Sequence, residues 1–300
     1  MTTRRRVLTI LAGAAALPVV GARASNSVKQ WRGVALGAEA RIILEHPDAE
    51  RMIPRAVAEV RRLEKVFSLY MNDSDLSKLN REGVLFEPAF ELVELLSVCS
   101  RLNSLTAGAF DPTVQTLWSL YAREHSNGLA PTEEQIARAK SLTNWEYVDF
   151  SSDRITFRRP DVSMTLNGIA QGFIADKITA LFRRHGVSNV LVNTGEIAAL
   201  GSAPDGAPWQ VKLGTRDGNE IQLSNAAVAT SAPLGTTFDT KGMAGHIIDP
   251  RTGYPGGHWS EVSVVSHSAA DADGLSTAFC LMSRNEIEAS QGANEVFLKS

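Results

Sequence analysis

Asp273 and Thr277 are the residues whose types and spacing most directly suggest metal chemistry. Ser268 and Asp271 have the spacing of a capping box, which predicts that a helix begins at Ser268. On that helix Asp273 and Thr277 stand at i and i+4, so a carboxylate and a hydroxyl share one face. Mg²⁺ takes few protein oxygens and completes its shell with substrate phosphates, and a helix N-terminus favours a phosphate nearby. The alternative is a well-capped helix that binds no ion.

A second polar cluster lies just upstream, in the stretch His246-Ile-Ile-Asp-Pro-Arg-Thr-Gly253. Its apolar start is typical of a strand, and Pro250 and Gly253 are residues that a tight turn favours. Imidazole titrates near neutrality, so His246 is a candidate general base. Asp249 could orient that ring or support a metal shell. The alternative for His246 is a strand-end histidine that only hydrogen-bonds the turn.

Two further segments could contact an anion or a ligand. Asp111 precedes Pro112, a pattern typical of an N-cap residue followed by proline at the first helical position, although its carboxylate could instead accept hydrogen bonds from a ligand. The segment 165–172 indicates a strand, a glycine turn and then a helix that continues to His185, so its backbone amides could face an anion. It lacks the glycine spacings of Walker and dinucleotide-binding loops.

The elements that must position these residues alternate irregularly between helix and strand. Hydrophobic periodicity predicts helices over 49–69, 75–80, 86–106 (with Pro88 in its first turn), 114–124 and 132–141, besides the two already described. Strands are predicted over 31–44 and 145–157 as pairs, over 190–200 with an interruption at 193–196, and over 209–214, 220–223, 262–265 and 295–298. Residues 229–237 are predicted to form a polar loop of small residues. Without regular βαβ alternation, the pattern favours an α+β fold.

The N-terminus has the features of an export signal. Arg4-Arg5-Arg6 precedes an apolar run that ends near Val20, and Ala22-Arg23-Ala24 offers a cleavage site. We interpret residues 1–24 as a twin-arginine signal peptide and residues 25–300 as a single domain. This predicts a periplasmic protein that does not itself span the membrane after cleavage.

Charge and cysteine content exclude some classes of partner and site. After cleavage the chain would keep 26 basic and 33 acidic residues, about −7, and it has no basic tract, which argues against nucleic-acid binding. Cys99 and Cys280 lie far apart in apolar helical contexts and match no metal-binding spacing. They are predicted to be buried free thiols rather than a disulfide.

Taken together, these segments resemble the ApbE family of flavin transferases, which move FMN from FAD onto a protein threonine. The resemblance covers nearly the whole chain from Trp31 onward. The motifs that carry it are Phe67-Ser-Leu-Tyr70 with Ser74, Gly108-Ala-Phe-Asp-Pro-Thr113, Leu166-Asn-Gly-Ile-Ala-Gln-Gly172, Asn193-Thr-Gly-Glu196, Ala229-Thr-Ser231, His246-Ile-Ile-Asp-Pro-Arg-Thr-Gly253 and Asp273-Gly-Leu-Ser-Thr277.

The resemblance implies a fold and a set of site residues. The expected fold is the ApbE-like, T-fold-related arrangement of mixed sheets and packed helices, with FAD between two subregions and Mg²⁺ at its pyrophosphate. Asp273 and Thr277 would ligate the metal through side chains and Ala170 through its backbone carbonyl. The residues that fall at FAD-contacting positions are Leu36, Tyr70, Ala109, Phe110, Asp111, Asn167, Gln171, Thr230 and Ser231.

The chain departs from the common family pattern at three positions. Gln171 stands where lysine is frequent, Glu196 follows one glycine where Gly-Gly-Asp is usual, and Ala232 replaces a glycine. The missing lysine removes a positive charge that could bind a phosphate oxygen. Together the departures resemble the exported branch associated with nitrous oxide reductase maturation.

The reaction that the resemblance implies is a Mg²⁺-dependent transfer of FMN from FAD to a threonine hydroxyl of an acceptor protein, with release of AMP. His246 would take the threonine proton, and the acceptor would be an exported or membrane-bound electron-transfer protein. The same residues would also serve a FAD pyrophosphatase, in which water replaces threonine. A third possibility is a maturation factor that binds FAD without catalysis.

Overall fold

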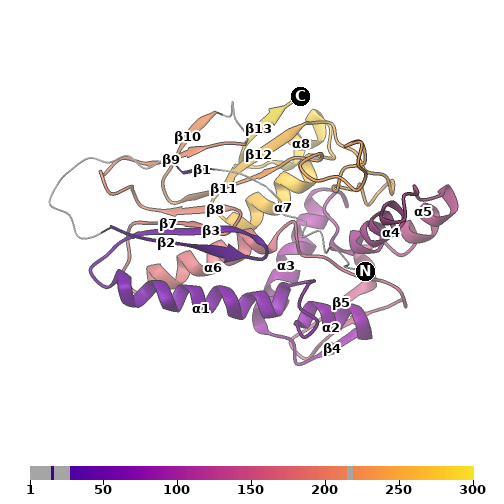
Figure 1. The fold of residues 1–300 in the computed structure, drawn as a ribbon, viewed down its shortest axis with the longest axis horizontal. Coiled ribbons are helices and arrows are strands. Elements are labelled where there is room, and N and C mark those ends of the chain that lie inside the picture. Colours follow the sequence, from indigo (N-terminus) through magenta and orange to yellow (C-terminus); the bar gives the residue numbers. More distant parts are fainter. Residues whose placement is uncertain (1–14, 17–27, 215–218) are drawn as a thin grey trace, which may run out of the picture.

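A seven-stranded antiparallel sheet forms the centre of the computed structural model, which describes residues 28–214 and 219–300 and the backbone of residues 15–16. The order of its strands is β13-β12-β11-β8-β7-β3-β2. Their bounds are β2 Val28–Ala35, β3 Ala38–Glu45, β7 Val190–Asn193, β8 Ile197–Leu200, β11 Ala226–Ser231, β12 Glu261–Ser266 and β13 Glu295–Lys299. The sheet therefore brings β3 beside β7, while the C-terminal strands β12 and β13 lie at the opposite edge from β2 (Figure 1).

Both faces of this sheet are buried, because successive side chains of a strand point to opposite faces. Val190 and Val192 of β7 belong to the main core, whereas Leu191 between them belongs to a smaller core on the other side. Three helices cover the first face: α1 Ala49–Phe67, α6 Ala170–Arg184 and α7 Ala269–Phe279. The second face packs against β9 Trp209–Lys212 and β10 Glu220–Leu223, a small sheet that also contains β1 Ala15–Ala16.

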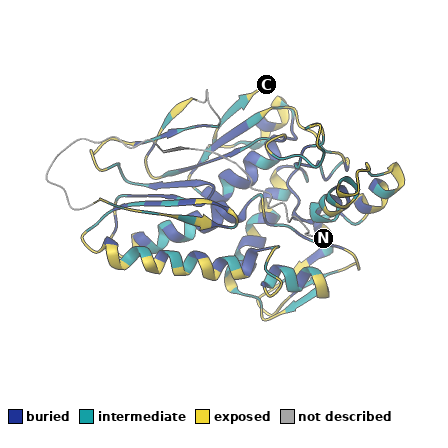
Figure 2. Ribbon diagram, viewed as in Figure 1, coloured by how far each residue is buried: buried dark blue, intermediate teal, exposed yellow. Residues whose placement is uncertain are grey.

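Most of the remaining elements extend from the helical layer, whereas α8 is drawn near the C-terminal end of the chain (Figure 1). They are α2 Asp75–Glu82, β4 Val84–Phe86, α3 Phe90–Leu105, η1 Pro112–Val114, α4 Gln115–Ser126, α5 Glu133–Lys140, η2 Trp145–Tyr147, β5 Val148–Phe150, β6 Arg154–Phe157 and α8 Arg284–Ser290. Helices α4 and α5 build a third small core with Ile248 of the long β11–β12 connection. Figure 2 shows buried residues concentrated in α7 and the strands around it.

Most predicted elements are confirmed, with their ends shifted by a few residues, and the α+β fold is confirmed. The segment 190–200 is a hairpin of β7 and β8, and Thr132 caps α5 with a full capping box. Ser268 caps α7 by accepting a hydrogen bond from the Asp271 amide. Cys99 and Cys280 are both buried and free.

Five local predictions were wrong, each because of a contact distant in sequence or a local turn. Helix α3 begins at Phe90, beyond Pro88, because residues 84–86 pair with β6. Residues 229–231 belong to β11 rather than to a loop, because they pair with β12.

The other three corrections concern predicted strands. The run that starts at His246 is not a strand, and only isolated bridges such as Ile248 to Pro255 form there, although the turn from Asp249 to Gly253 is present. No strand precedes the turn at 167–169, and residues 145–147 form a 3₁₀ turn before β5.

The signal peptide predicted for residues 1–24 lies outside the described residues apart from Ala15–Ala16. Within the described ranges, no helix combines the length and the apolar character needed to cross a membrane.

Candidate active site

A cavity of about 400 Å³ lies where α7, the start of α6, the segment before α4 and the β11–β12 connection meet. Its volume falls within the range of small-molecule binding sites. It brings together residues that are up to about 200 positions apart in the sequence. The predicted site residues that line it are Tyr70, Ala109, Phe110, Asp111, Asn167, Gln171, Thr230, Ser231, His246, Asp273 and Thr277.

Three predicted residues do not line this cavity. Leu36 lies at the β2–β3 turn with φ 46°, and its amide donates to Glu64 at 2.7 Å. Ala170 is the buried first residue of α6, one position before Gln171. Asp249 points into a different set of contacts, described below.

Helix α7 is held at its start by a carboxylate from α6. Asp176 accepts hydrogen bonds from the Ser268 hydroxyl and from the amides of Ala269 and Ala270 at 2.8–3.0 Å. These are the unpaired donors that every helix N-terminus presents. The bonds fix the first turn of α7 against α6, one turn before Asp273. The position of Asp273 therefore depends on contacts between the two helices as well as on α7 itself.

Asp273 and Glu196 form a buried acidic pair in the cavity wall. Asp273 accepts from the Gly172 amide at 3.0 Å, and Glu196 accepts from the Thr230 amide at 3.3 Å. Burial raises the pKa of Asp273 to about 7, and burial together with the Asp273 charge raises the pKa of Glu196 well above its usual value. Neither carboxylate makes an ion pair with another residue of the described ranges. A bound cation would relieve this cost, because opposite charge favours the ionised form.

The oxygen atoms around Asp273 suit a hard divalent cation. The hydroxyl of Thr277 lies 3.3 Å from that of Ser231, which is also 2.8 Å from the Ser276 hydroxyl. The described residues contain no group of three or more His, Cys, Asp or Glu side chains able to hold a metal. Mg²⁺ needs no such cluster, since one or two carboxylates with substrate phosphates and water suffice. The donor set thus fits Mg²⁺ better than a metal that prefers nitrogen or sulfur ligands.

Two glycines bring the backbone close to this cluster. A Cβ atom at Gly168 would lie 3.0 Å from the Thr277 hydroxyl. Gly195 has φ +110°, and a Cβ there would lie 2.5 Å from the side-chain amide carbon of Gln171. The Thr194 hydroxyl also donates to the Gln171 carbonyl at 2.8 Å. The β7–β8 turn therefore packs closely against Gln171, whose neutral side chain lies in the cavity wall.

Asp111 is the N-cap that the sequence predicted. One carboxylate oxygen accepts from the Thr113 amide at 2.8 Å and from the Thr113 hydroxyl at 2.6 Å, and the other accepts from the Trp145 amide at 2.9 Å. Burial raises the pKa of Asp111 despite these bonds. Asp111 therefore shapes the cavity wall by tying the start of η1 to η2.

His246 lies in the cavity wall with its ring oriented by backbone rather than by a carboxylate. Its Nδ1 is 3.1 Å from the Thr236 carbonyl, which can only accept, so the neutral ring has its lone pair on Nε2. Burial lowers the pKa of His246, while the carbonyls of Thr236 and Pro233 act in the opposite direction. A neutral imidazole at pH 7 is the form that can accept a proton.

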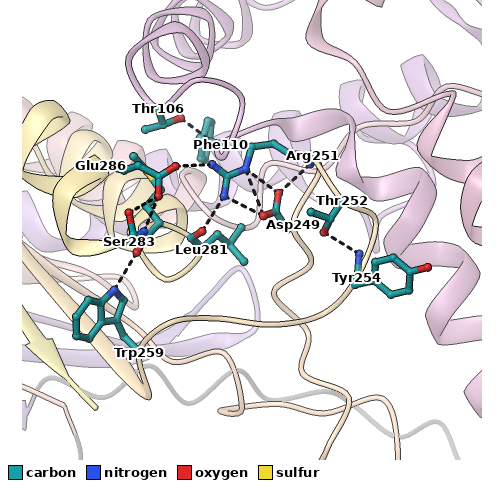
Figure 3. Close-up of polar contacts among 11 residues, drawn as sticks. Thr106, Phe110, Asp249, Arg251, Thr252, Tyr254, Trp259, Leu281, Ser283 and Glu286 are labelled. Atoms are coloured by element: carbon teal, nitrogen blue, oxygen red, sulfur yellow. Dashed lines mark hydrogen bonds and ion pairs between the residues drawn. The ribbon is translucent and has the colours of Figure 1, made fainter.

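The expectation that Asp249 orients His246 was wrong. Asp249 is engaged by Arg251, whose Nη2 lies 2.9 Å from one carboxylate oxygen (Figure 3). The same guanidinium donates to the Leu281 carbonyl at 2.7 Å and contacts Glu286 at 3.4 Å. Arg251 thus links the turn after His246 to the end of α7 and the start of α8. Local spacing suggested a His–Asp pair, but the guanidinium two residues away competes more effectively for the carboxylate.

Several lining residues were not predicted. Glu196 was noted only as a departure from the family pattern, and its pairing with Asp273 depends on the β8–β11 contact. Trp118 of α4 also lines the cavity and packs edge-on against Phe238 with ring centroids 5.2 Å apart. On an amphipathic helix such a tryptophan is indistinguishable in sequence from a core residue.

Comparison with known proteins gives a consistent result. The chain matches the model of the ApbE family over residues 36–295. The FAD:protein FMN transferase of Vibrio cholerae is 30% identical over 252 residues, which cover 79% of this chain and 75% of that protein. The enzyme of the same name from Chlamydia pneumoniae is 32% identical over 250 residues, covering 78% of each chain.

Solved structures extend the match to the fold. The apo form of the Pseudomonas stutzeri flavinyl transferase ApbE superposes with a TM-score of 0.80 and 26% identity, covering 91% of both chains. The ApbE protein of Thermotoga maritima gives a TM-score of 0.81 at 26% identity, covering 91% of this chain and 94% of that one.

Proposed function

Because this chain belongs to the ApbE family and is a FAD:protein FMN transferase, we propose that it transfers FMN to a threonine hydroxyl in a Mg²⁺-dependent reaction. The observation that carries the proposal is the buried acidic pair Asp273–Glu196 beside Thr277 in a ligand-sized cavity. Two carboxylates without a protein cation indicate a site that is completed by a metal ion and its phosphate ligands.

Asp273 and Thr277 are the residues that would hold the metal, with the Ala170 carbonyl as the third ligand implied by the family pattern. Bound there, Mg²⁺ would neutralise charge on the pyrophosphate and favour in-line displacement. Gln171 can donate two N–H groups but carries no charge. Binding of the pyrophosphate in this chain therefore depends on the metal more heavily than it would with a lysine at position 171.

His246 is the residue that we assign to proton transfer. The threonine hydroxyl oxygen forms a new bond to the FMN-side phosphorus, and the bond from that phosphorus to the bridging oxygen of the AMP phosphate breaks. The hydroxyl proton passes to Nε2 of His246, and AMP leaves with the bridging oxygen. The carbonyls of Thr236 and Pro233 beside the ring would stabilise the imidazolium formed in this step.

We also propose that the protein acts in the periplasm after export. The support is the twin-arginine pattern at Arg4-Arg5-Arg6 and the apolar run behind it. The acceptor would then be an exported protein or the periplasm-facing part of a membrane-bound electron-transfer protein.

The test is to incubate the protein with FAD, Mg²⁺ and a candidate periplasm-facing acceptor domain, and to measure protein mass and released AMP. We expect an adduct of FMN mass on one threonine and an equal amount of AMP. Chelation of Mg²⁺ and replacement of the acceptor threonine by valine should each abolish the adduct. Free FMN and AMP in the presence of that acceptor, without adduct, would instead indicate a FAD pyrophosphatase. Bound but intact FAD would contradict both catalytic functions.

A further inference from the structure

A second hollow of about 360 Å³ lies beside the active-site cavity, on the same β11–β12 connection. We call it the loop groove. The residues that line it are Pro233, Leu234, Met243, Gly245, Gly256, Gly257, His258, Trp259 and Ser260. Apart from the Pro233 carbonyl beside His246, none of these residues takes part in the proposed reaction, and most of the residues that line the groove are exposed.

A single turn separates the groove from the active-site cavity. Residues 232–235 form a turn closed by a hydrogen bond of 2.9 Å from the Gly235 amide to the Ala232 carbonyl. Ala232 and Gly235 face the cavity, whereas Pro233 and Leu234 face the groove. Gly245 of the groove directly precedes His246. The groove therefore begins one residue from the side chain that we assign to proton transfer.

The groove has a buried floor and apolar walls that reach solvent. Pro233 and Gly245 are buried, and a Cβ at Gly245 would lie 2.4 Å from the Pro233 carbonyl, so this floor is closely packed. Leu234 is 60% exposed and Met243 78% exposed. Neither side chain has a polar role, and large exposed apolar side chains that gather around a hollow are typical of binding surfaces.

One wall of the groove is rigid. Trp259 donates from its indole nitrogen to the Met282 carbonyl at 3.0 Å, and the Arg284 guanidinium lies 5.2 Å from its ring centroid. Figure 3 shows Trp259 beside the network that joins Arg251 to Leu281 and Glu286. An aromatic side chain held in place before binding loses little conformational freedom when a partner docks.

We propose that the loop groove docks an apolar side chain of the acceptor protein, close in sequence to the threonine that receives FMN. This inference rests on the proposed function. An acceptor threonine has to reach His246 from solvent, and the groove lies across a single turn from the cavity that His246 lines. An extended segment advances about 3.3 Å per residue. An apolar side chain one to three residues from the threonine could therefore enter the loop groove while the threonine enters the neighbouring active-site cavity.

Synthetic decapeptides with a central threonine test this assignment. One set carries leucine or phenylalanine at one position within three residues of the threonine, and a matched set carries aspartate there. Each is incubated with the full-length protein, FAD and Mg²⁺, and adduct formation is followed by mass spectrometry. We expect kcat/KM to be about tenfold higher for the apolar peptides, because burial of one apolar side chain is worth at least that factor.

Substitutions in the loop groove test whether the groove causes the preference for apolar peptides. Leu234→Asp and Met243→Asp should each remove the preference for apolar peptides while FAD binding, measured by quenching of flavin fluorescence, stays unchanged. Leu129→Asp is a matched control, because Leu129 is also 60% exposed but lies between α4 and α5. It should behave as wild type.

Failure of the groove proposal and failure of the proposed transfer reaction would give different results. Adducts that form equally on both peptide sets, or a preference that survives both groove variants, would overturn the groove while leaving the transferase function intact. A dimer of this chain in sedimentation that Met243→Asp dissociates would show that a second copy, not the acceptor, occupies the groove. Cleavage of FAD to FMN and AMP without adduct on any peptide would contradict transfer to an extended segment.

Discussion

Asp273 is the residue on which the proposed chemistry depends most. It is almost fully buried and carries a carboxylate close to that of Glu196, without an ion pair to another described residue. Its neighbours on α7 behave differently: Asp271 is on the surface and pairs with Arg101. A buried acidic residue with a raised pKa inside a cavity is typical of functional sites. Burial of the ionised Asp273 carboxylate therefore lowers the stability of the metal-free fold, and a bound cation would restore it.

The pH dependence of stability follows from the raised pKa of Asp273. A carboxyl group with a folded pKa of about 7 instead of 3.8 stabilises the fold at low pH and loses this contribution as pH rises from about 4 to about 7. The loss is at most on the order of 4 kcal/mol. We expect the Tm of the metal-free protein to fall between pH 5 and pH 8, and Mg²⁺ to raise it at pH 8.

Asp273→Asn removes the charge but keeps an oxygen that can accept from the Gly172 amide. Its metal-free Tm should fall less between pH 5 and pH 8, and Mg²⁺ should not change it, as thermal unfolding would show. Asp271→Asn, on the same helix, should retain the wild-type response. An Asp273→Asn protein with the wild-type pH slope and Mg²⁺ response would show that the metal is held elsewhere.

The protonation of His246 predicts a second pH effect, which acts on activity: activity should fall as the pH falls, whereas the stability contribution of Asp273 rises. Burial lowers its pKa below 6.5, so the neutral ring persists at pH 6.5 and activity should fall only in more acidic solution. His246→Gln should reduce kcat by roughly 10²–10⁴-fold and leave FAD affinity unchanged, as expected for loss of a general base. The rate of AMP release at saturating Mg²⁺ measures this. His267→Gln, at an exposed position, is the control, and near-normal turnover by His246→Gln would remove the histidine from the mechanism.

At the scale of elements, the site depends on how the β11–β12 connection is fixed to α7. His246 lies on an irregular segment that makes only isolated bridges, so its position cannot come from a strand. Asp176 fixes the start of α7, and Arg251 fixes the turn after His246 to the other end of the same helix. Contacts with α7 thus fix the positions of both Asp273 and the segment that carries His246.

Arg251→Met should loosen this connection. It leaves the Asp249 carboxylate, of which 14% is exposed, without its charged partner, so we expect a loss of about 1–3 kcal/mol in the free energy of unfolding. Urea unfolding measures the loss, and kcat should fall more than FAD affinity. Addition of Asp249→Asn should recover part of the stability, since the unpaired charge is then gone. If the two changes are simply additive, the pair is not what fixes the turn.

At the scale of the whole molecule, the sequence predicted the elements whose determinants are local. The N-cap of α7, the N-cap role of Asp111 and the helix predicted over 49–69, which spans Ala49–Phe67, depend on neighbouring residues and are confirmed. Some of the wrong predictions concern pairing over long distances: residues 229–231 were predicted as a loop, but they pair with β12.

The same distinction applies to the site. Most of the site residues predicted from the family motifs line the cavity, but the motifs did not reveal that Glu196 pairs with Asp273 or that Asp249 pairs with Arg251. The first pairing joins residues that are far apart in the sequence, and the second depends on whether a guanidinium or an imidazole reaches the Asp249 carboxylate. Local spacing cannot decide which of several acceptors a guanidinium or a histidine will meet.

The most direct test of the central claim is a reaction in ¹⁸O-labelled water with FAD, Mg²⁺ and an acceptor domain that is in excess over FAD. Transfer to a hydroxyl takes no oxygen from solvent, so the account predicts an unlabelled FMN adduct on one threonine and unlabelled AMP in equal amount. FMN that carries one ¹⁸O atom, with the acceptor unmodified, would show that water is the nucleophile and would contradict the transfer proposed for this site.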